Sequence, residues 1–195
     1  MTMNSIERHP LQPYLPKNAT VLFLGSFPPP RKRWSMEFFY PNIQNDMWRI
    51  WGLIFFNDPN HFVLLKEKKF DYQKIIDFCN THGLAFYDTA SAVRRLQENA
   101  SDKFLEVVQP TNIEALLSQI PDCRAIVTTG EKATDVLVST YQCAKPKVGT
   151  CERIQINSQE YAFYRMPSSS RAYPLALAQK AEAYKLLVSL FHVQN

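Results

Sequence analysis

The chain has 195 residues with a formal net charge of +4 at pH 7, and 46% of its residues are hydrophobic. This length suits one well-packed domain and is short for two, so we expect a single domain over residues 1–195. No apolar stretch approaches the ~20 residues of a bilayer span, which argues against a membrane protein. The modest basic charge favours anionic partners without demonstrating one, because many soluble enzymes are equally basic.

The cysteines are widely and unevenly spaced, at Cys79, Cys123, Cys143 and Cys151. Because no Cys-x-x-Cys pair occurs, the sequence signals neither a zinc site nor an iron–sulfur cluster, and we expect no metal and no cofactor. No secretory leader is visible before the polar N-terminal residues, and reduced thiols are typical of the cytoplasm, so we expect a cytoplasmic protein. No apolar surface stripe is evident, and we therefore expect a monomer.

The N-terminal part of the chain is predicted to contain an arm, one strand and one helix. Residues 1–18 carry three prolines and no clear period, which indicates an irregular arm. Residues 20–25 are uncharged and rich in β-branched and aliphatic side chains, as in a buried strand. The Pro-Pro-Pro run that follows prevents a helix directly after this strand. Over 45–56 apolar residues recur at helical spacing, and Asn45 stands where an N-cap would stand.

The rest of the chain alternates predicted strands and helices. Further buried strands are expected at 84–88, 123–129 and 161–164, with a short extension or hairpin arm at 154–157. Further helices are expected at 71–81, 113–120, 132–141 and 175–191. Residues 57–69 read as irregular, and 89–109 give no firm signal. Alternation of this kind favours parallel strands with helices on both faces. We therefore predict an α/β fold, a three-layer αβα sandwich around a central, mainly parallel four-stranded sheet.

Small-residue loops follow the first and the last of these strands. Gly25-Ser26-Phe27-Pro28-Pro29 comes after the first strand, and Arg165-Met166-Pro167-Ser168-Ser169-Ser170-Arg171 ends the last one. In an open parallel sheet, ligands bind just beyond the carboxyl ends of the strands. A third segment, from Phe39 to Trp48, supplies aromatics, amides and a carboxylate. The sequence therefore predicts one crevice with walls from both ends of the chain.

These segments resemble the uracil-DNA glycosylase superfamily, particularly its mismatch-specific and hypoxanthine-DNA glycosylase branches. The loop at Gly25 is similar to the family's Gly-x-x-Pro-Gly-like loop, and Asn45-Asp46-Met47-Trp48 is similar to its Asn-x-Phe-Trp segment. The turn Thr128-Thr129-Gly130-Glu131-Lys132 and the proline–serine loop at 166–170 follow in the family's order. The resemblance runs from about Thr20 to the final helix.

The resemblance implies a function on DNA. It implies a monofunctional DNA glycosylase of base-excision repair, which flips a deaminated base, hypoxanthine or uracil, out of double-stranded DNA and hydrolyses its N-glycosidic bond. It implies no catalytic lysine, because no lysine lies in the pocket motifs, and hence no strand cleavage. Two alternatives stay open. One is a DNA-binding or damage-sensing protein that has lost the chemistry. The other is a small hydrolase of free nucleosides, which the lack of a Gly-x-Ser-x-Gly elbow disfavours.

The resemblance also implies roles for single residues. Tyr40 would stack on the extruded base, although it also reads as an ordinary core aromatic. Asn45 would hold the catalytic water, although it also reads as a plain N-cap. Asp88, at the end of a predicted strand, would assist as a general base or would cap a turn. The remaining substrate contacts are expected from Gly25, Ser26, Phe27, Pro28 and Ser168.

The expected DNA contacts lie in the last loop and beside the first. Backbone N–H groups and hydroxyls of serines suit phosphate contacts, which position a protein without reading sequence. Solvated surface is the alternative for the basic residues. The residues assigned to DNA are Ser169, Ser170, Arg171, Tyr173, Arg31 and Arg33.

Two positions depart from the family pattern. Phe27 stands where many mismatch-type relatives carry a water-orienting asparagine, and Met166 stands where relatives often carry a histidine. The four histidines lie outside the motifs, so no catalytic histidine is expected. These departures motivate the damage-sensing alternative.

Overall fold

The computed structural model describes residues 5–97 and 102–192. Its centre is a five-stranded sheet in the order β5-β2-β8-β10-β9. Four of these strands are parallel and match the predicted ones: β5 (Leu84–Asp88), β2 (Val21–Gly25), β8 (Ala125–Thr129) and β10 (Gln159–Met166). Uncharged residues fill β2, β8 and all but the last position of β5, because helices cover these strands on both faces.

The prediction of four strands is wrong by one. The fifth strand, β9 (Thr150–Ile156), pairs antiparallel with β10 along its whole length. Asn157 and Ser158 both have positive φ between these strands, which is the geometry of a two-residue hairpin turn. The polar side chains of β9 are exposed at the sheet edge, so the strand has none of the hydrophobic pattern of the central four. Only its last residues were foreseen, as a hairpin arm.

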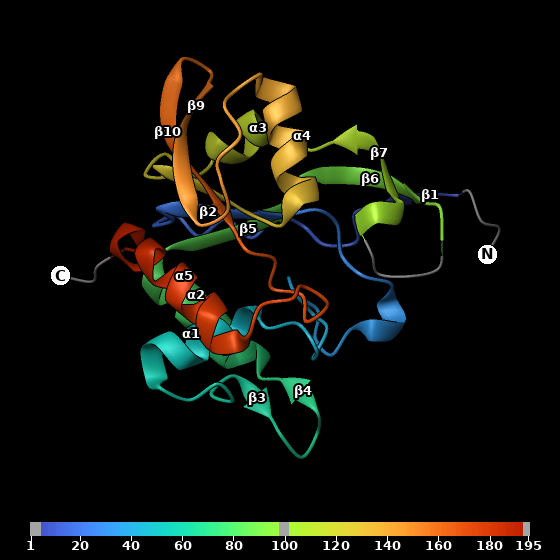
Figure 1. Ribbon diagram of the computed structural model, residues 1–195, viewed down its shortest axis with the longest axis vertical. Helices are drawn as coiled ribbons and strands as arrows, with labels where there is room; N and C mark the ends of the chain where they lie inside the picture. Colours follow the sequence, from blue (N-terminus) through green and yellow to red (C-terminus); the bar gives the residue numbers. More distant parts are fainter. Residues whose placement is uncertain (1–4, 98–101, 193–195) are drawn as a thin grey trace.

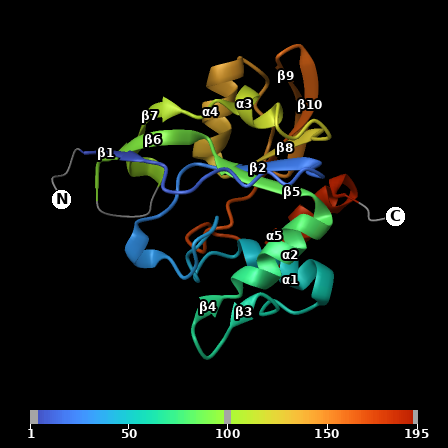
Figure 2. The same cartoon turned by 180° about the vertical axis from the view of Figure 1, so that it is seen from behind.

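Helices cover both faces of the main sheet, which gives three layers (Figure 1). On one face lie α1 (Met47–Phe56), α2 (Tyr72–His82) and α5 (Leu177–Tyr184), and on the other lie α3 (Ile113–Leu117) and α4 (Glu131–Tyr141). The view from behind shows the same two groups of helices (Figure 2). The core under α1 is aromatic, with Trp48 and Trp51 fully buried against Phe86 and Phe23.

The final helix is shorter than the predicted 175–191. The α-helix ends at Tyr184, and a 3₁₀ helix, η3 (Lys185–Leu190), continues the chain. Short 3₁₀ stretches are frequent at the ends of α-helices. Leu187 in η3 and Phe191 after it are both buried, and Phe191 packs on Trp51.

A second, antiparallel sheet was not predicted. Its order is β1-β6-β7, formed by β1 (Ile6–Arg8), β6 (Ala90–Arg95) and β7 (Leu105–Pro110). The expectation of a wholly irregular arm over 1–18 is therefore wrong for β1, and 89–109 contain two strands. The short 3₁₀ helix η2 (Asp102–Phe104) precedes β7. Charged residues interrupt β6 and β7, and one of the two partners of β6, the strand β1, lies more than 80 residues away, so local periodicity carries little signal.

Two smaller elements complete the fold. The segment predicted to be irregular at 57–69 contains a hairpin of β3 (Val63–Leu64) with β4 (Lys69–Phe70). A 3₁₀ turn, η1 (Arg31–Arg33), follows the proline run. Within 5–97 and 102–192, no helix is long and apolar enough to cross a membrane.

Candidate functional site

A cavity of about 140 Å³ lies where β2, β5 and β8 end, and both predicted loops and the segment before α1 contribute to its wall. The expectation that these distant segments form one crevice is met geometrically, because Asn45 and Ser170 form an isolated β-bridge. Further wall residues are Pro29, Phe39, Pro41, Asn42, Asp102 and Thr129. The wall residues that the sequence singled out are Gly25, Ser26, Phe27, Pro28, Tyr40, Asn45, Asp88, Ser168, Ser169 and Ser170.

Gly25 lets two polar side chains approach the floor of the cavity. It pairs with Asp88 across β2 and β5. A Cβ atom at Gly25 would lie 2.5 Å from Oδ1 of Asp88 and 3.4 Å from the hydroxyl of Tyr40. The first of these contacts is far inside van der Waals distance, so a larger residue at this position would displace the carboxylate.

Tyr40 forms an aromatic part of the wall. Its φ of 52° is unusual for a residue other than glycine, and such strain persists only where the surroundings hold it. Its hydroxyl is 2.6 Å from Oγ1 of Thr129, and burial raises the pKa of the phenol far above its usual value. The neighbouring Phe39 packs on Phe86 in the core and is 3% exposed. The two adjacent aromatics therefore differ in burial.

Asn45 is not the N-cap that the sequence predicts, because the N-cap of α1 is Asp46, but the Asn45 side chain binds the first helical residue. Its Oδ1 accepts a hydrogen bond of 2.9 Å from the backbone N–H of Met47. The amide N–H₂ group of Asn45 has no hydrogen-bond partner among the described residues. An amide offers one acceptor oxygen and two N–H donors, so this side chain binds Met47 with one end and offers donors with the other.

Asp88 lies at the cavity with a partner that the sequence did not reveal. Nε2 of His9 is 2.7 Å from Oδ2 of Asp88, and the His9 side chain is 2% exposed. His9 comes from the arm directly after β1. The two residues are 79 positions apart, and nothing in the local pattern around His9 marks it as a site residue.

Asp102 is a second carboxylate in the wall that the sequence analysis missed. Oγ of Ser26 donates a hydrogen bond of 2.7 Å to Oδ1 of Asp102. Burial, and next the proximity of Asp88, raise the pKa of Asp102, against the lowering effects of Ser26, Lys132 and Arg95. Asp102 belongs to η2, in the segment that gave no firm signal.

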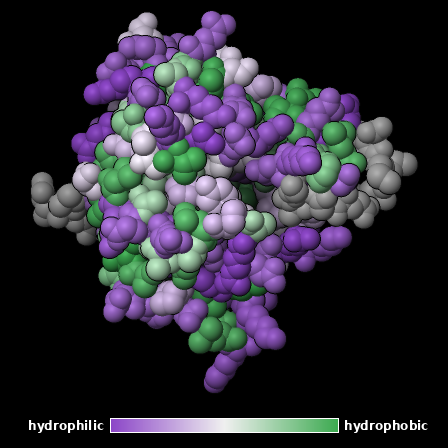
Figure 3. Space-filling view, viewed as in Figure 1, coloured by the Kyte–Doolittle hydropathy of each residue, from purple (hydrophilic) through white to green (hydrophobic). Residues whose placement is uncertain are grey.

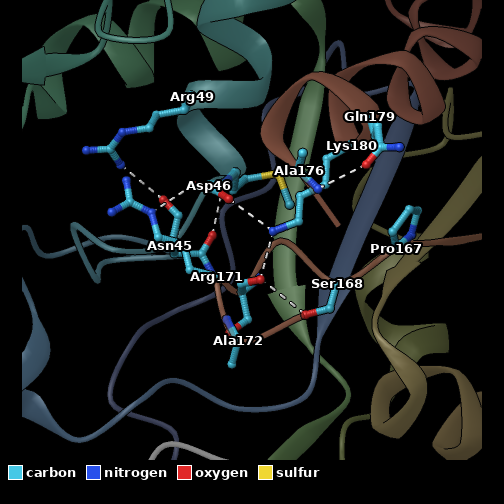
Figure 4. Close-up of polar contacts among 12 residues, drawn as sticks. Asn45, Asp46, Arg49, Pro167, Ser168, Arg171, Ala172, Ala176, Gln179 and Lys180 are labelled. Atoms are coloured by element: carbon cyan, nitrogen blue, oxygen red, sulfur yellow. Dashed lines mark hydrogen bonds and ion pairs between the residues drawn. The ribbon is translucent and has the colours of Figure 1, made fainter. Parts of the chain in front are cut away.

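The proline–serine loop is fastened to α1 and α5 by a buried ionic cluster around Asp46 (Figure 4). The carboxylate of Asp46 binds Nζ of Lys180 at 3.0 Å and Nε of Arg171 at 3.1 Å. Lys180 also donates to the carbonyl of Ser170 at 2.8 Å, and the Asp46 backbone N–H donates to that of Ser169. Asp46 therefore holds the loop and does not line the cavity. Met166, 1% exposed, does not line it either.

A wider hollow of about 500 Å³ adjoins the cavity and shares part of its wall. Cationic side chains come from three segments, with Arg33 in η1, Lys103 in η2 and Arg171 after the serines, and Tyr173 lies beside them. Figure 3 shows this face hollowed near its centre and bordered largely by hydrophilic residues. Arg31 lines neither space, because it pairs with Glu37 and lies over the ring of Trp34.

No family model and no curated protein matches this chain. A solved structure does: the solution NMR structure of a "putative Uracil DNA glycosylase" from Methanosarcina acetivorans. It is 21% identical, the match covers 95% of this chain and 99% of that one, and the TM-score is 0.64. At this identity the likeness establishes the fold, over nearly the whole of both chains.

Proposed function

We propose that the protein is a monofunctional DNA glycosylase that removes a deaminated base, uracil or hypoxanthine, from double-stranded DNA. The observation that carries this proposal is a base-sized cavity opening beside a cationic hollow. Its volume of about 140 Å³ is close to the ~150 Å³ of a protein cavity that holds one benzene molecule. The similarity of the fold to that of the archaeal protein supports the same conclusion.

In this proposal the wall recognises a base that has left the stack. The ring of Tyr40 offers a stacking face, as enzymes that flip bases require. The free N–H₂ of Asn45 donates to a carbonyl oxygen, which uracil and hypoxanthine both carry. Donors here also favour departure of the base, because negative charge develops on it as the bond breaks. The Oδ1 of Asn45 accepts one hydrogen bond from the backbone N–H of Met47. An amide oxygen is too weakly basic to take a proton from water, so another residue must serve as the base.

Asp88 is the better candidate for the residue that binds the attacking water and takes its proton. The water oxygen bonds to C1′ of the sugar, its proton passes to Asp88, and the electrons of the glycosidic bond leave with the base. Asp102, where ionised, adds negative charge near the cationic sugar that forms as the bond breaks. None of the residues lining the cavity is a lysine, so the wall offers no amine for a Schiff base. We therefore expect an intact strand with an abasic site.

The hollow would hold the DNA around the extruded nucleotide. Arg33, Arg171, the backbone N–H group of Ser169 and the hydroxyl of Ser170 suit contacts to phosphates. Tyr173 is placed to fill the gap left in the stack. Arg31 is left out of this set, because it lines neither the cavity nor the hollow.

The first experiment offers duplexes with one uracil, hypoxanthine, xanthine or mismatched thymine and measures free base and alkali-labile sites. Asn45→Asp is the informative variant, because it keeps the oxygen that accepts from Met47 and replaces the N–H₂ group. We expect it to fold with nearly unchanged stability and to lose base release. Asn45→Ala also removes the hydrogen bond to the N–H of Met47, which costs ~1 kcal/mol of stability. Base release by Asn45→Asp at the rate of the unmodified protein would remove this amide from the mechanism.

A second function of another class is a damage sensor that binds DNA without cutting the glycosidic bond. Phe27 favours it, because an aromatic ring in the first loop cannot orient water by hydrogen bonding. The same panel of duplexes distinguishes the glycosylase from the damage sensor. Salt-sensitive, lesion-dependent binding with no base released would identify the sensor.

A further inference from the structure

His9 and Asp88 form a buried polar pair outside the cluster around Asp46. The arm that carries His9 is fixed on both sides of it. The backbone N–H of His9 donates to Ser91 in β6 at 2.8 Å, and Tyr14 exchanges backbone hydrogen bonds with Phe86 in β5. The arm thus bridges the second sheet and the main sheet, and between these two contacts His9 reaches Asp88 in the cavity wall.

The imidazole of His9 is held in one orientation. Its ring packs against Tyr87 at 4.5 Å and edge-on to Phe27 at 5.2 Å between centroids. Its Nδ1 lies 3.1 Å from the backbone nitrogen of Leu11 and 3.0 Å from the carbonyl oxygen of the same residue. A neutral ring accepts from that N–H, and a protonated ring donates to that carbonyl. In both states Nε2–H continues to face Asp88.

This contact divides the two oxygens of Asp88 between two tasks. Oδ2 accepts from His9. Oδ1 lies over Gly25, at the floor of the cavity, where the absence of a side chain leaves it room. One oxygen is thereby anchored while the other faces the space in which a water would be held.

We propose that His9 is a positioning residue for base excision, which fixes Asp88 so that Oδ1 faces the attacking water. The inference rests on the proposed glycosylase function. When water attacks C1′, one O–H bond breaks and its proton goes to Oδ1, while the His9 hydrogen bond to Oδ2 is kept. The ring also fixes the rotamer of Asp88, since a rigid partner costs less ordering in the transition state than a mobile one.

The test compares His9→Phe with His9→Gln. Phenylalanine keeps the ring and its packing but lacks the donor, whereas the glutamine amide can donate to Asp88. We expect His9→Phe to lower kcat for base release about 10- to 100-fold, the range for losing a hydrogen bond to a charged group. KM and the dissociation constant for DNA should stay within about 2-fold of the unmodified protein. His9→Gln should recover most of kcat, and His61→Gln, in the β3–β4 region, serves as the matched control with unchanged kcat.

A spectroscopic measurement tests the hydrogen bond between His9 and Asp88 independently of turnover. In ¹⁵N–¹H NMR spectra we expect a downfield, slowly exchanging Nε2–H signal from His9 that is lost in Asp88→Asn. An unchanged signal in Asp88→Asn would overturn the inference, and so would a normal kcat in His9→Phe. Should the unmodified protein release no base from any duplex, the glycosylase proposal fails and, with it, the catalytic role of His9, whereas the NMR result still establishes or rejects the contact.

Discussion

Replacing Lys180 with methionine should destabilise the protein far more than any other lysine substitution in α5 or η3. Lys180 is fully buried, and its Nζ binds both the carboxylate of Asp46 and the carbonyl of Ser170. Methionine has a similar length but no charge. The substitution leaves Asp46, whose side chain is only 8% exposed, with Arg171 as its remaining cationic partner.

The magnitude follows from the burial of the partner left behind. Removing one member of a buried ion pair costs 3–5 kcal/mol, roughly, because the other charge stays in a poorly solvated place. Arg171 still neutralises part of that charge, although its own side chain is 49% exposed. We therefore expect the lower end of the range, about 3 kcal/mol of unfolding free energy. For a chain of this size that corresponds to a fall in Tm of about 6–12 °C.

The assay is urea unfolding followed by near-ultraviolet circular dichroism, with Lys185→Met as the control. Lys185 lies in the next helical turn and pairs with Glu182, but both side chains are more than half exposed. Exposed pairs of this kind contribute about 0–1 kcal/mol. The double variant Lys180→Met/Asp46→Asn should lose less stability than the sum of the two single changes. A loss below 1 kcal/mol for Lys180→Met, equal to the control, would refute the reasoning.

Three further predictions concern the cavity and the hollow. Gly25→Ala places a Cβ 2.5 Å from Oδ1 of Asp88, so it should abolish base release while DNA affinity changes little; retained turnover would show that the carboxylate is not needed there. Asp102→Asn should gain stability over the unmodified protein as pH rises from 4 to 8, because the raised pKa of Asp102 means that the folded chain holds that proton more tightly than the unfolded chain. A Tm difference independent of pH would contradict this. Arg33→Ala should lower the slope of log affinity for DNA against log salt concentration by about 1, whereas Arg31→Ala should leave it unchanged; equal slopes for both would exclude a phosphate contact by Arg33.

The central strands were predictable because their burial is nearly complete. In β2 and β8 every residue is buried, so the sequence shows short uncharged runs, which are typical of buried strands and not of exposed loops. The loops at their ends followed from topology, since parallel strands bring their carboxyl ends to one edge. The strand β9 and the second sheet were not predictable in the same way. Their exposed faces carry charged residues, and the pairing of β1 with β6 joins segments more than 80 residues apart.

The residues of the candidate site fall into the same two groups, those that the local sequence predicts and those that it does not. Residues that end a buried strand or directly precede α1 were found from the sequence, among them Gly25, Asn45 and Asp88. His9 and Asp102 were missed because each lies in a segment with no hydrophobic period and reaches the cavity only through tertiary structure. A histidine in a proline-containing arm carries no local signal for a partner 79 residues away.

The polar chemistry of the cavity depends on the second sheet more than on the first. The main sheet brings small residues and one carboxylate, Asp88, to its edge. These residues leave room for a base, but they do not by themselves fix the orientation of the Asp88 carboxylate. The second sheet adds what fixes and charges that space: β1 leads into His9, and the β6–β7 connection carries Asp102 to the hydroxyl of Ser26. Because β6 begins two residues after Asp88, a shift of the second sheet would move both carboxylates relative to the serine loop. Packing of the second sheet therefore sets the geometry of the site, although most of its residues never touch the cavity.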